Sequence, residues 1–253
     1  MIHGFMGSCF SGCIFSTRHD LNCRRRGGTL PRLYEIFPAH MSLFQLDPQS
    51  IATRVRTAND PALLPTPGAS VVRGISGFTL LSVAGFAPWP ILDLWFRRGT
   101  EMQLYISCTA IFIGLSGPLL HRLIIGPGSL ARFYKLFALS FLTYAAVWVA
   151  FWVWLRGREG EIAGLLGGAA AMGAILAFAF DAQRCALKII AALFAPNALG
   201  YFAGGWFEGK LAIDHRLAAM LLWGVCYGIG FGAGLGLAFH ICQSRARAAL
   251  GGR

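Results

Sequence analysis

Six long apolar runs occupy the chain from residue 71 onward, and short clusters of charged residues separate them. None of the runs alternates between apolar and polar positions with a period of two, so none has the pattern of a barrel strand. A helix of about 20 apolar residues crosses a hydrocarbon core about 30 Å thick. The sequence therefore predicts an all-α integral membrane protein built as a bundle of six transmembrane helices. The predicted spans are residues 71–96, 102–124, 130–155, 162–180, 185–207 and 217–242.

Residues 1–70 contain no such run. They carry three consecutive arginines at positions 24–26 and several prolines, which favours a basic, poorly ordered N-terminal tail. Met41 begins a stretch with the character of an ordinary polar N-terminus. We therefore interpret residues 1–40 as an extension upstream of the start of translation. Residues 243–253 are predicted to form a basic C-terminal tail.

The composition supports a membrane location and argues against several other classes of protein. Charged residues make up 13% of the chain, whereas soluble domains contain about 25%. A net charge of +11 would suggest nucleic acid as the partner of a soluble protein. No basic stretch is interleaved with aromatic residues, however, so the expected partner is the lipid bilayer and not nucleic acid. The seven cysteines are scattered and form no disulfide framework.

Metal and cofactor sites are not expected. Cys9, Cys13, His19 and Cys23 lie near one another in the sequence, but their spacing is not one of the common zinc patterns. The remaining cysteines fall in or beside apolar runs, where a thiol behaves as a small hydrophobic group. The chain therefore predicts neither a metal ion nor an organic cofactor.

The loops between the predicted spans carry unequal charge, and this asymmetry predicts the orientation in the membrane. Six spans place both termini on one side, and from residue 41 onward that side carries eleven lysines and arginines against six on the other. Cationic residues concentrate on the cytoplasmic side of membrane proteins. All seven tryptophans fall in the opposite half of the spans, where indole rings favour the headgroup layer. Both termini are therefore predicted to be cytoplasmic, in the cell membrane, which is the inner membrane if the source is Gram-negative.

Six glycines occupy thirteen residues of the last span, and four of them recur every four residues. On a helix this spacing forms a ridge without side chains, which lets neighbouring helices approach closely in lipid. The ridge consists of Gly224, Gly228, Gly232 and Gly236. The stretch also fits the loose G-x-G-x-x-G/A pattern of a dinucleotide site, but no strand precedes it and no acidic residue follows it. We therefore predict that this helix is central and touched on two sides, and that Gly164 and Gly168 give the span 162–180 a similar smooth face.

Polar residues in the spans are few, and ionisable groups are absent from their middles, which disfavours an ion pump or a transporter with an acidic relay. Pro196 and Asn197 lie near the middle of the fifth span, where the proline frees a backbone carbonyl and the amide can bind a substrate group or a neighbouring helix. Ser116 lies at a second proline break, in the span 102–124, and Thr143 and Tyr144 lie in the third span. These five residues are the candidate lining of a binding cavity.

The tetrapeptide GLSG at residues 114–117 resembles the G-x-S-G element of rhomboid intramembrane proteases, and His240 lies on a later span. That resemblance implies Ser116 as a nucleophile with a histidine as its base. The histidine-rich element on an earlier span is missing, and so is the glycine spacing after His240. We therefore assign no catalytic residue.

Two functional classes stay open. The favoured one is a non-enzymatic structural or accessory membrane component that packs through its glycine-rich helix faces with a second copy of itself or with another membrane protein. The alternative is a small-solute transporter or channel with a cavity near Asn197 and Ser116. The first is favoured because the sequence shows no polar residues converging at the middle of the membrane.

Overall fold

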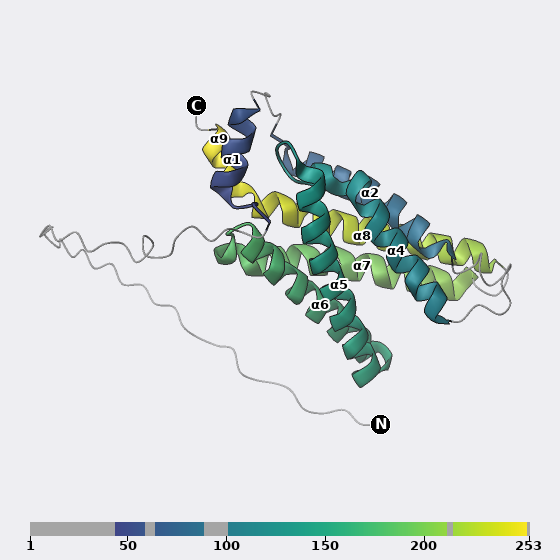
Figure 1. Cartoon of the computed structure of the whole chain (residues 1–253). Helices are drawn as coiled ribbons and strands as arrows, with labels where there is room; N and C mark the ends of the chain where they lie inside the picture. The colour runs from purple at the N-terminus through teal and green to yellow at the C-terminus, as the bar shows by residue number, and fades with distance from the viewer. Residues whose placement is uncertain (1–43, 59–63, 89–100, 212–214, 252–253) are drawn as a thin grey trace, which may run out of the picture. The chain divides into compact units, whose positions relative to one another are not determined.

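The computed structural model describes residues 44–58, 64–88, 101–211 and 215–251 (Figure 1). These residues belong to one compact unit, Met41–Arg253. They form α-helices and two short 3₁₀ turns, and no strand occurs among them. The helices are α1 (Pro48–Thr57), α2 (Pro67–Phe86), α4 (Glu101–Leu120), α5 (Ser129–Leu155), α6 (Gly157–Ala179), α7 (Ala186–Leu211), α8 (Arg216–Cys242) and α9 (Ser244–Gly251), and the 3₁₀ turns are η1 (His121–Leu123) and η2 (Gln183–Cys185).

The predicted fold class is confirmed. Within the described residues six helical segments are long and apolar enough to cross a membrane, and they lie on α2, α4, α5, α6, α7 and α8. Large apolar side chains face outward from them, and Leu187, Leu199 and Phe178 are each more than 70% exposed. Water would penalise so much exposed apolar surface, whereas a bilayer solvates it.

The first span begins earlier than the sequence pattern indicates. Thr66 caps α2, because its hydroxyl accepts a hydrogen bond of 3.2 Å from the backbone N–H of Ala69. Pro67 follows as the first helical residue, a position where the missing N–H costs nothing. The helix therefore starts at residue 67 and not at 71, and the predicted end of this span at residue 96 lies outside the described residues.

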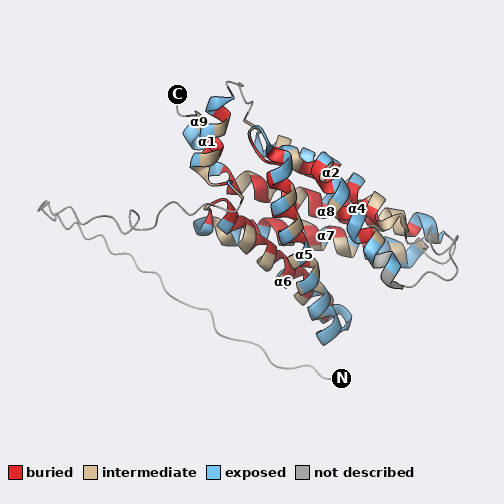
Figure 2. Cartoon of the chain, viewed as in Figure 1, coloured by how far each residue is buried: buried red, intermediate tan, exposed pale blue. Residues whose placement is uncertain are grey.

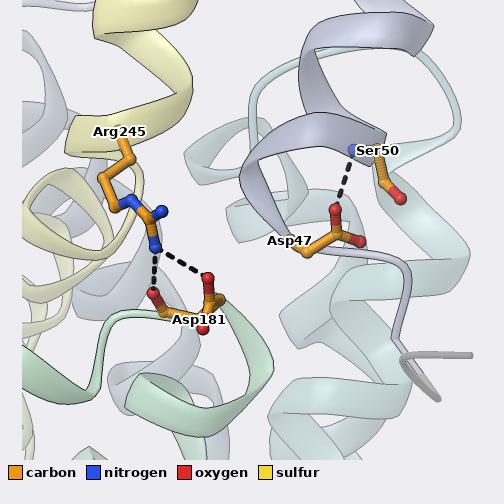
Figure 3. A network of polar contacts seen from close by, with 4 residues as sticks. All are labelled: Asp47, Ser50, Asp181 and Arg245. Atoms are coloured by element: carbon orange, nitrogen blue, oxygen red, sulfur yellow. Dashed lines mark hydrogen bonds and ion pairs between the residues drawn. The ribbon is translucent and has the colours of Figure 1, made fainter. Parts of the chain in front are cut away.

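Residues 48–57, which the sequence places in the irregular N-terminal tail, form α1. The carboxylate of Asp47 accepts a hydrogen bond of 2.9 Å from the backbone N–H of Ser50 and so caps this helix (Figure 3). Ile51 and Val55 lie four residues apart, and both are buried. The tail prediction is therefore wrong for these ten residues, because one short amphipathic helix gives too few periods to stand out. The proposed extension, residues 1–40, lies outside the described residues.

Within the predicted C-terminal tail, Ser244–Gly251 form α9. This helix lies beside α1, where Arg56 donates a hydrogen bond of 3.0 Å to the carbonyl of Ala249 (Figure 1). Arg245 forms an ion pair of 2.7 Å with Asp181, in the turn after α6 (Figure 3). The side chains of Arg245 and Asp181 are both well exposed. This ion pair therefore contributes at most about 1 kcal/mol to the stability of the fold. The helix predicted as a tail is thus attached at two points.

Helix α8 is the centre of the bundle, and its most extensive contacts are with α7 and α2. The buried residues follow α8 and the sides of the helices that face it (Figure 2). Helix α4 packs against α2, and α6 returns along α5 after a tight reversal. In that reversal Arg156 and Gly157 both have positive φ angles, 54° and 53°.

The glycines of α8 divide between its two neighbours. A Cβ atom built on Gly232 would lie 2.9 Å from the Cα atom of Ile75 on α2. A Cβ atom on Gly230 would lie 2.8 Å from the Cα atom of Gly200 on α7. Gly228 and Gly236 also face α2, Gly234 faces α7, and Gly224 has ordinary van der Waals contact with α2. At all of these glycines except Gly224, helix α8 therefore meets α2 or α7 more closely than a side chain would allow.

Aromatic rings fill the space between α5 and α8. Phe133, Phe137 and Phe141 stack in succession along α5, with ring centroids 5.2 and 5.0 Å apart. Phe231 of α8 meets this stack at Phe141 and also stacks on Phe78 of α2, with centroids 4.5 Å apart. Helix α8 therefore packs against α5 through aromatic rings, whereas its glycines bring its backbone close to α2 and α7.

Candidate functional site

Asn197 is a fully buried polar residue of the predicted site. Its side chain is completely inaccessible to solvent, near the middle of α7. Its Nδ2 atom donates a hydrogen bond of 2.8 Å to the hydroxyl of Tyr144 on α5. The structure therefore brings together two of the predicted residues, which lie 53 positions apart in the sequence and on different helices.

Pro196 precedes Asn197 and lies inside α7. A proline removes the hydrogen bond that its own N–H would donate to the carbonyl four residues earlier, which here is the carbonyl of Ala192. That oxygen lies against α8, 2.7 Å from a Cβ atom built on Gly234. The freed carbonyl therefore faces the bare backbone of α8 at this glycine.

Tyr144 is enclosed by aromatic side chains. Its ring makes an edge contact with Phe231, with centroids 5.2 Å apart, and its hydroxyl lies beside that of Tyr227 on α8. Asn197, Tyr144 and Tyr227 therefore form a small polar cluster between α5, α7 and α8, which we call the Asn197 cluster. All three side chains are buried.

One atom of the Asn197 cluster lacks a partner. The Oδ1 atom of Asn197 is buried, and no described residue donates a hydrogen bond to it. A buried amide oxygen without a donor costs about 1–3 kcal/mol. The atom is therefore the point in the cluster at which a water molecule or a polar ligand group would gain most by binding.

Polar and aromatic groups continue from the Asn197 cluster toward the end of the bundle where α5 and α6 connect. The ring of Trp223 stacks on Tyr227 with centroids 5.2 Å apart, and Tyr201 makes an edge contact with Trp223 at 5.7 Å. The hydroxyl of Tyr201 lies beside the carboxylate of Glu161 in the second turn of α6. This succession of hydroxyl, indole and carboxylate groups reaches from mid-depth to a helix end.

Ser116 and Thr143 do not join the Asn197 cluster through any hydrogen bond of the described residues. The hydroxyl of Ser116, although fully buried, donates to the carbonyl of Ile113 on its own helix at 2.7 Å. The hydroxyl of Thr143 donates to the carbonyl of Leu139 at 2.8 Å, and this residue is half-buried. Both hydroxyls therefore satisfy their own helix, as serine and threonine commonly do in apolar surroundings.

The serine and histidine of the protease resemblance have other partners. Ser116 Oγ bonds within α4, and the Nδ1 atom of His240 lies 3.4 Å from the hydroxyl of Ser70 on α2. A nucleophilic serine needs a base within hydrogen-bond reach. The contacts of these two side chains do not form that arrangement.

Gly164 and Gly168 lie where α6 crosses α5. A Cβ atom built on Gly164 would lie 3.0 Å from the carbonyl oxygen of Trp148, and one on Gly168 would lie 2.7 Å from the ring of Tyr144. Gly168 thus leaves room for the tyrosine that bonds Asn197. The glycine face of α6 therefore determines both the packing of α6 on α5 and the position of Tyr144 in the Asn197 cluster.

Sequence reasoning missed a cavity of about 230 Å³ at the start of α5. Its lining comes from the segment before α1, from α1 itself and from the first turns of α5, namely Phe44, Gln45, Arg54, Gly128, Ala131, Arg132 and Lys135. Arg132 and Lys135 are visible in the sequence as a basic pair at the start of a span. The contribution of Arg54 depends on α1, which the sequence pattern did not indicate.

Within the described part of the chain, no three histidine, cysteine, aspartate or glutamate side chains are grouped as ligands for a metal ion. Comparison with protein-family models, with curated protein sequences and with solved structures finds no match to this chain.

Proposed function

We propose that the protein is a non-enzymatic structural or accessory component of a membrane. The observation that carries this proposal is that the polar side chains in the middle of the spans form hydrogen bonds within the protein. Asn197 and Tyr144 bond each other, whereas Ser116 and Thr143 bond their own helices. The described cavity lies at the start of α5, away from these groups.

The close packing of α8 supports the same proposal. Its glycines leave α2 and α7 in backbone contact with it, and packing of this kind stabilises helices in lipid where the hydrophobic effect contributes little between them. Such a core is suited to holding the helices in one fixed arrangement. The partners that fit this role are the bilayer, a second copy of the chain or another membrane protein.

The orientation belongs to the same proposal. We infer that both termini are cytoplasmic and that the protein lies in the cell membrane. Two observations support this orientation. Lysine and arginine are in excess on the side of the bundle that carries the termini, and the tryptophans lie toward the opposite side. Trp152 and Trp154, at the end of α5, are both strongly exposed, as expected for rings in a headgroup layer.

A permeability measurement tests the proposal. We expect proteoliposomes that contain the full chain to shrink and reswell in stopped-flow light scattering at the rate of protein-free liposomes. Water, glycerol and urea are the probes in separate runs, and a potassium diffusion potential with a voltage-sensitive dye reports ion leakage. A rate several times that of protein-free liposomes for any probe would contradict the structural role.

A second candidate is the small-solute transporter or channel, and the unpaired Oδ1 atom of Asn197 is the observation that favours it. If a probe does permeate, the variant Asn197→Leu should abolish its flux, because the cluster then loses its only amide. Thr143→Ala is the matched control, since its hydroxyl bonds its own helix and not the Asn197 cluster. Equal loss of flux in both variants would show that the pathway does not pass Asn197.

A further inference from the structure

We propose that the cavity at the start of α5 binds a phosphate group. Three cationic side chains line it, Arg54 from α1 and Arg132 and Lys135 from α5, and no acidic residue is among its lining residues in the described chain. Arg54 and Arg132 lie close enough for their charges to repel each other. An anion in the cavity would relieve that repulsion, and the oxygens of a phosphate match the donor geometry of guanidinium groups.

The geometry of Arg132 gives the most specific support. This side chain is only 7% exposed, and it is held rigidly, because its Nε atom donates to the carbonyl of Gly128 at 3.2 Å and its Nη2 atom to the carbonyl of Pro127 at 2.6 Å. The other terminal nitrogen, Nη1, is buried, and no described residue accepts a hydrogen bond from it. A buried guanidinium N–H without an acceptor is costly, and Arg132 lines the cavity, so an anion bound there would balance its charge.

The first turn of α5 adds a second source of positive potential. Gly128 is the N-cap residue, with a φ of 67°, and no side chain caps the helix. The hydroxyl of Ser129, which follows it, is within hydrogen-bonding distance of His121 Nδ1 at 2.9 Å. The N–H groups of the first turn therefore lack a side-chain acceptor, and the N-terminal end of a helix of 27 residues favours an anion.

The position of the cavity in the membrane indicates which phosphate compounds can reach it. The first turn of a spanning helix lies at headgroup depth, and α5 enters its apolar segment at Ser129. Lys135 is exposed, so the cavity is open beside a cationic side chain. A phosphate can therefore come from an anionic phospholipid in the surrounding leaflet or from a soluble phosphate compound that approaches from the aqueous side.

Native mass spectrometry of the full chain tests the proposal and separates the two sources. The protein is released from detergent micelles doped either with phosphatidylglycerol or with phosphatidylcholine, and inorganic [³²P]phosphate is measured separately by equilibrium dialysis at constant ionic strength. We expect a one-to-one adduct with phosphatidylglycerol that is at least fivefold more abundant than the adduct with phosphatidylcholine. Binding of inorganic phosphate without lipid selectivity would support the site with a soluble ligand.

Lys135→Gln is the test variant, because this exposed residue can lose its charge without disturbing the core. It should reduce the bound fraction at least fivefold, and Arg132→Gln should reduce it further if that variant folds. Lys188→Gln is the matched control, since it removes an exposed lysine from the first turn of another spanning helix, α7. If neither probe binds, or if Lys135→Gln and Lys188→Gln reduce binding equally, the proposed site is wrong.

Discussion

Replacing Gly232 with leucine should destabilise the protein by about 3 kcal/mol, the upper end of the cost of overpacking a well-packed core. The reason is that the added side chain would meet backbone and not a movable side chain. A Cβ atom alone would lie 2.8 Å from the carbonyl carbon of Gly74 and 2.9 Å from the Cα atom of Ile75. Helices α2 and α8 would have to separate to accommodate it.

Alanine substitutions give a sharper comparison. In a helix interior alanine is more favourable than glycine by about 1 kcal/mol, so Gly205→Ala on α7 should be neutral or stabilising, because nothing lies within 4 Å of a Cβ atom there. Gly232→Ala should be destabilising despite the same propensity gain. The measurement is the free energy of unfolding in mixed micelles as the fraction of denaturing detergent rises. Equal effects at Gly232 and Gly205 would contradict backbone contact between α2 and α8.

Replacing Phe231 with alanine should have the second largest effect, a loss of about 2 kcal/mol. Phe231 is only 2% exposed, and its ring contacts aromatic residues on α2, α5 and α8. In lipid the transfer part of the cost largely disappears, because the unfolded reference is itself apolar. The cavity part remains, and about 24 cal/mol per Å³ over about 100 Å³ gives this estimate.

The control for Phe231 is Phe178 on α6, which is 72% exposed. Phe178→Ala removes the same atoms from a surface that lipid can refill, so it should change the unfolding free energy by less than about 0.5 kcal/mol. The same detergent titration measures both variants. A Phe231→Ala effect no larger than that of Phe178→Ala would show that the ring contacts between α5 and α8 do not hold the bundle together.

Hydropathy predicts the six spanning segments because each is an independent signal of about twenty residues, and lipid penalises any charge within it. The short helices α1 and α9 give no such signal. Each has only eight to ten residues, and each is stabilised by the other through contacts such as that between Arg56 and Ala249. Their pairing therefore depends on tertiary structure that no local pattern records.

The candidate residues show the same limit. The spacing of the α8 glycines predicts a bare helix face, but the choice of Gly74 and Gly200 as opposing residues requires the helix arrangement. The sequence reveals Asn197 and Tyr144 as unusual polar residues in their spans. It does not reveal the 2.8 Å hydrogen bond between them. The basic cavity needs Arg54 beside Arg132 and Lys135, from a helix that the sequence pattern missed.

The central claim is that a bilayer surrounds α2 to α8 and that α6, α7 and α8 each cross it once. Labelling of single cysteines in intact cells with a membrane-impermeant maleimide tests this most directly, in a chain whose native cysteines are replaced by alanine. Glu159→Cys and Ser244→Cys are suitable positions, because both residues are exposed and three spans separate them. We expect Glu159→Cys to react from outside and Ser244→Cys to react only after the cells are permeabilised. Reaction of both positions from the same side would contradict the account.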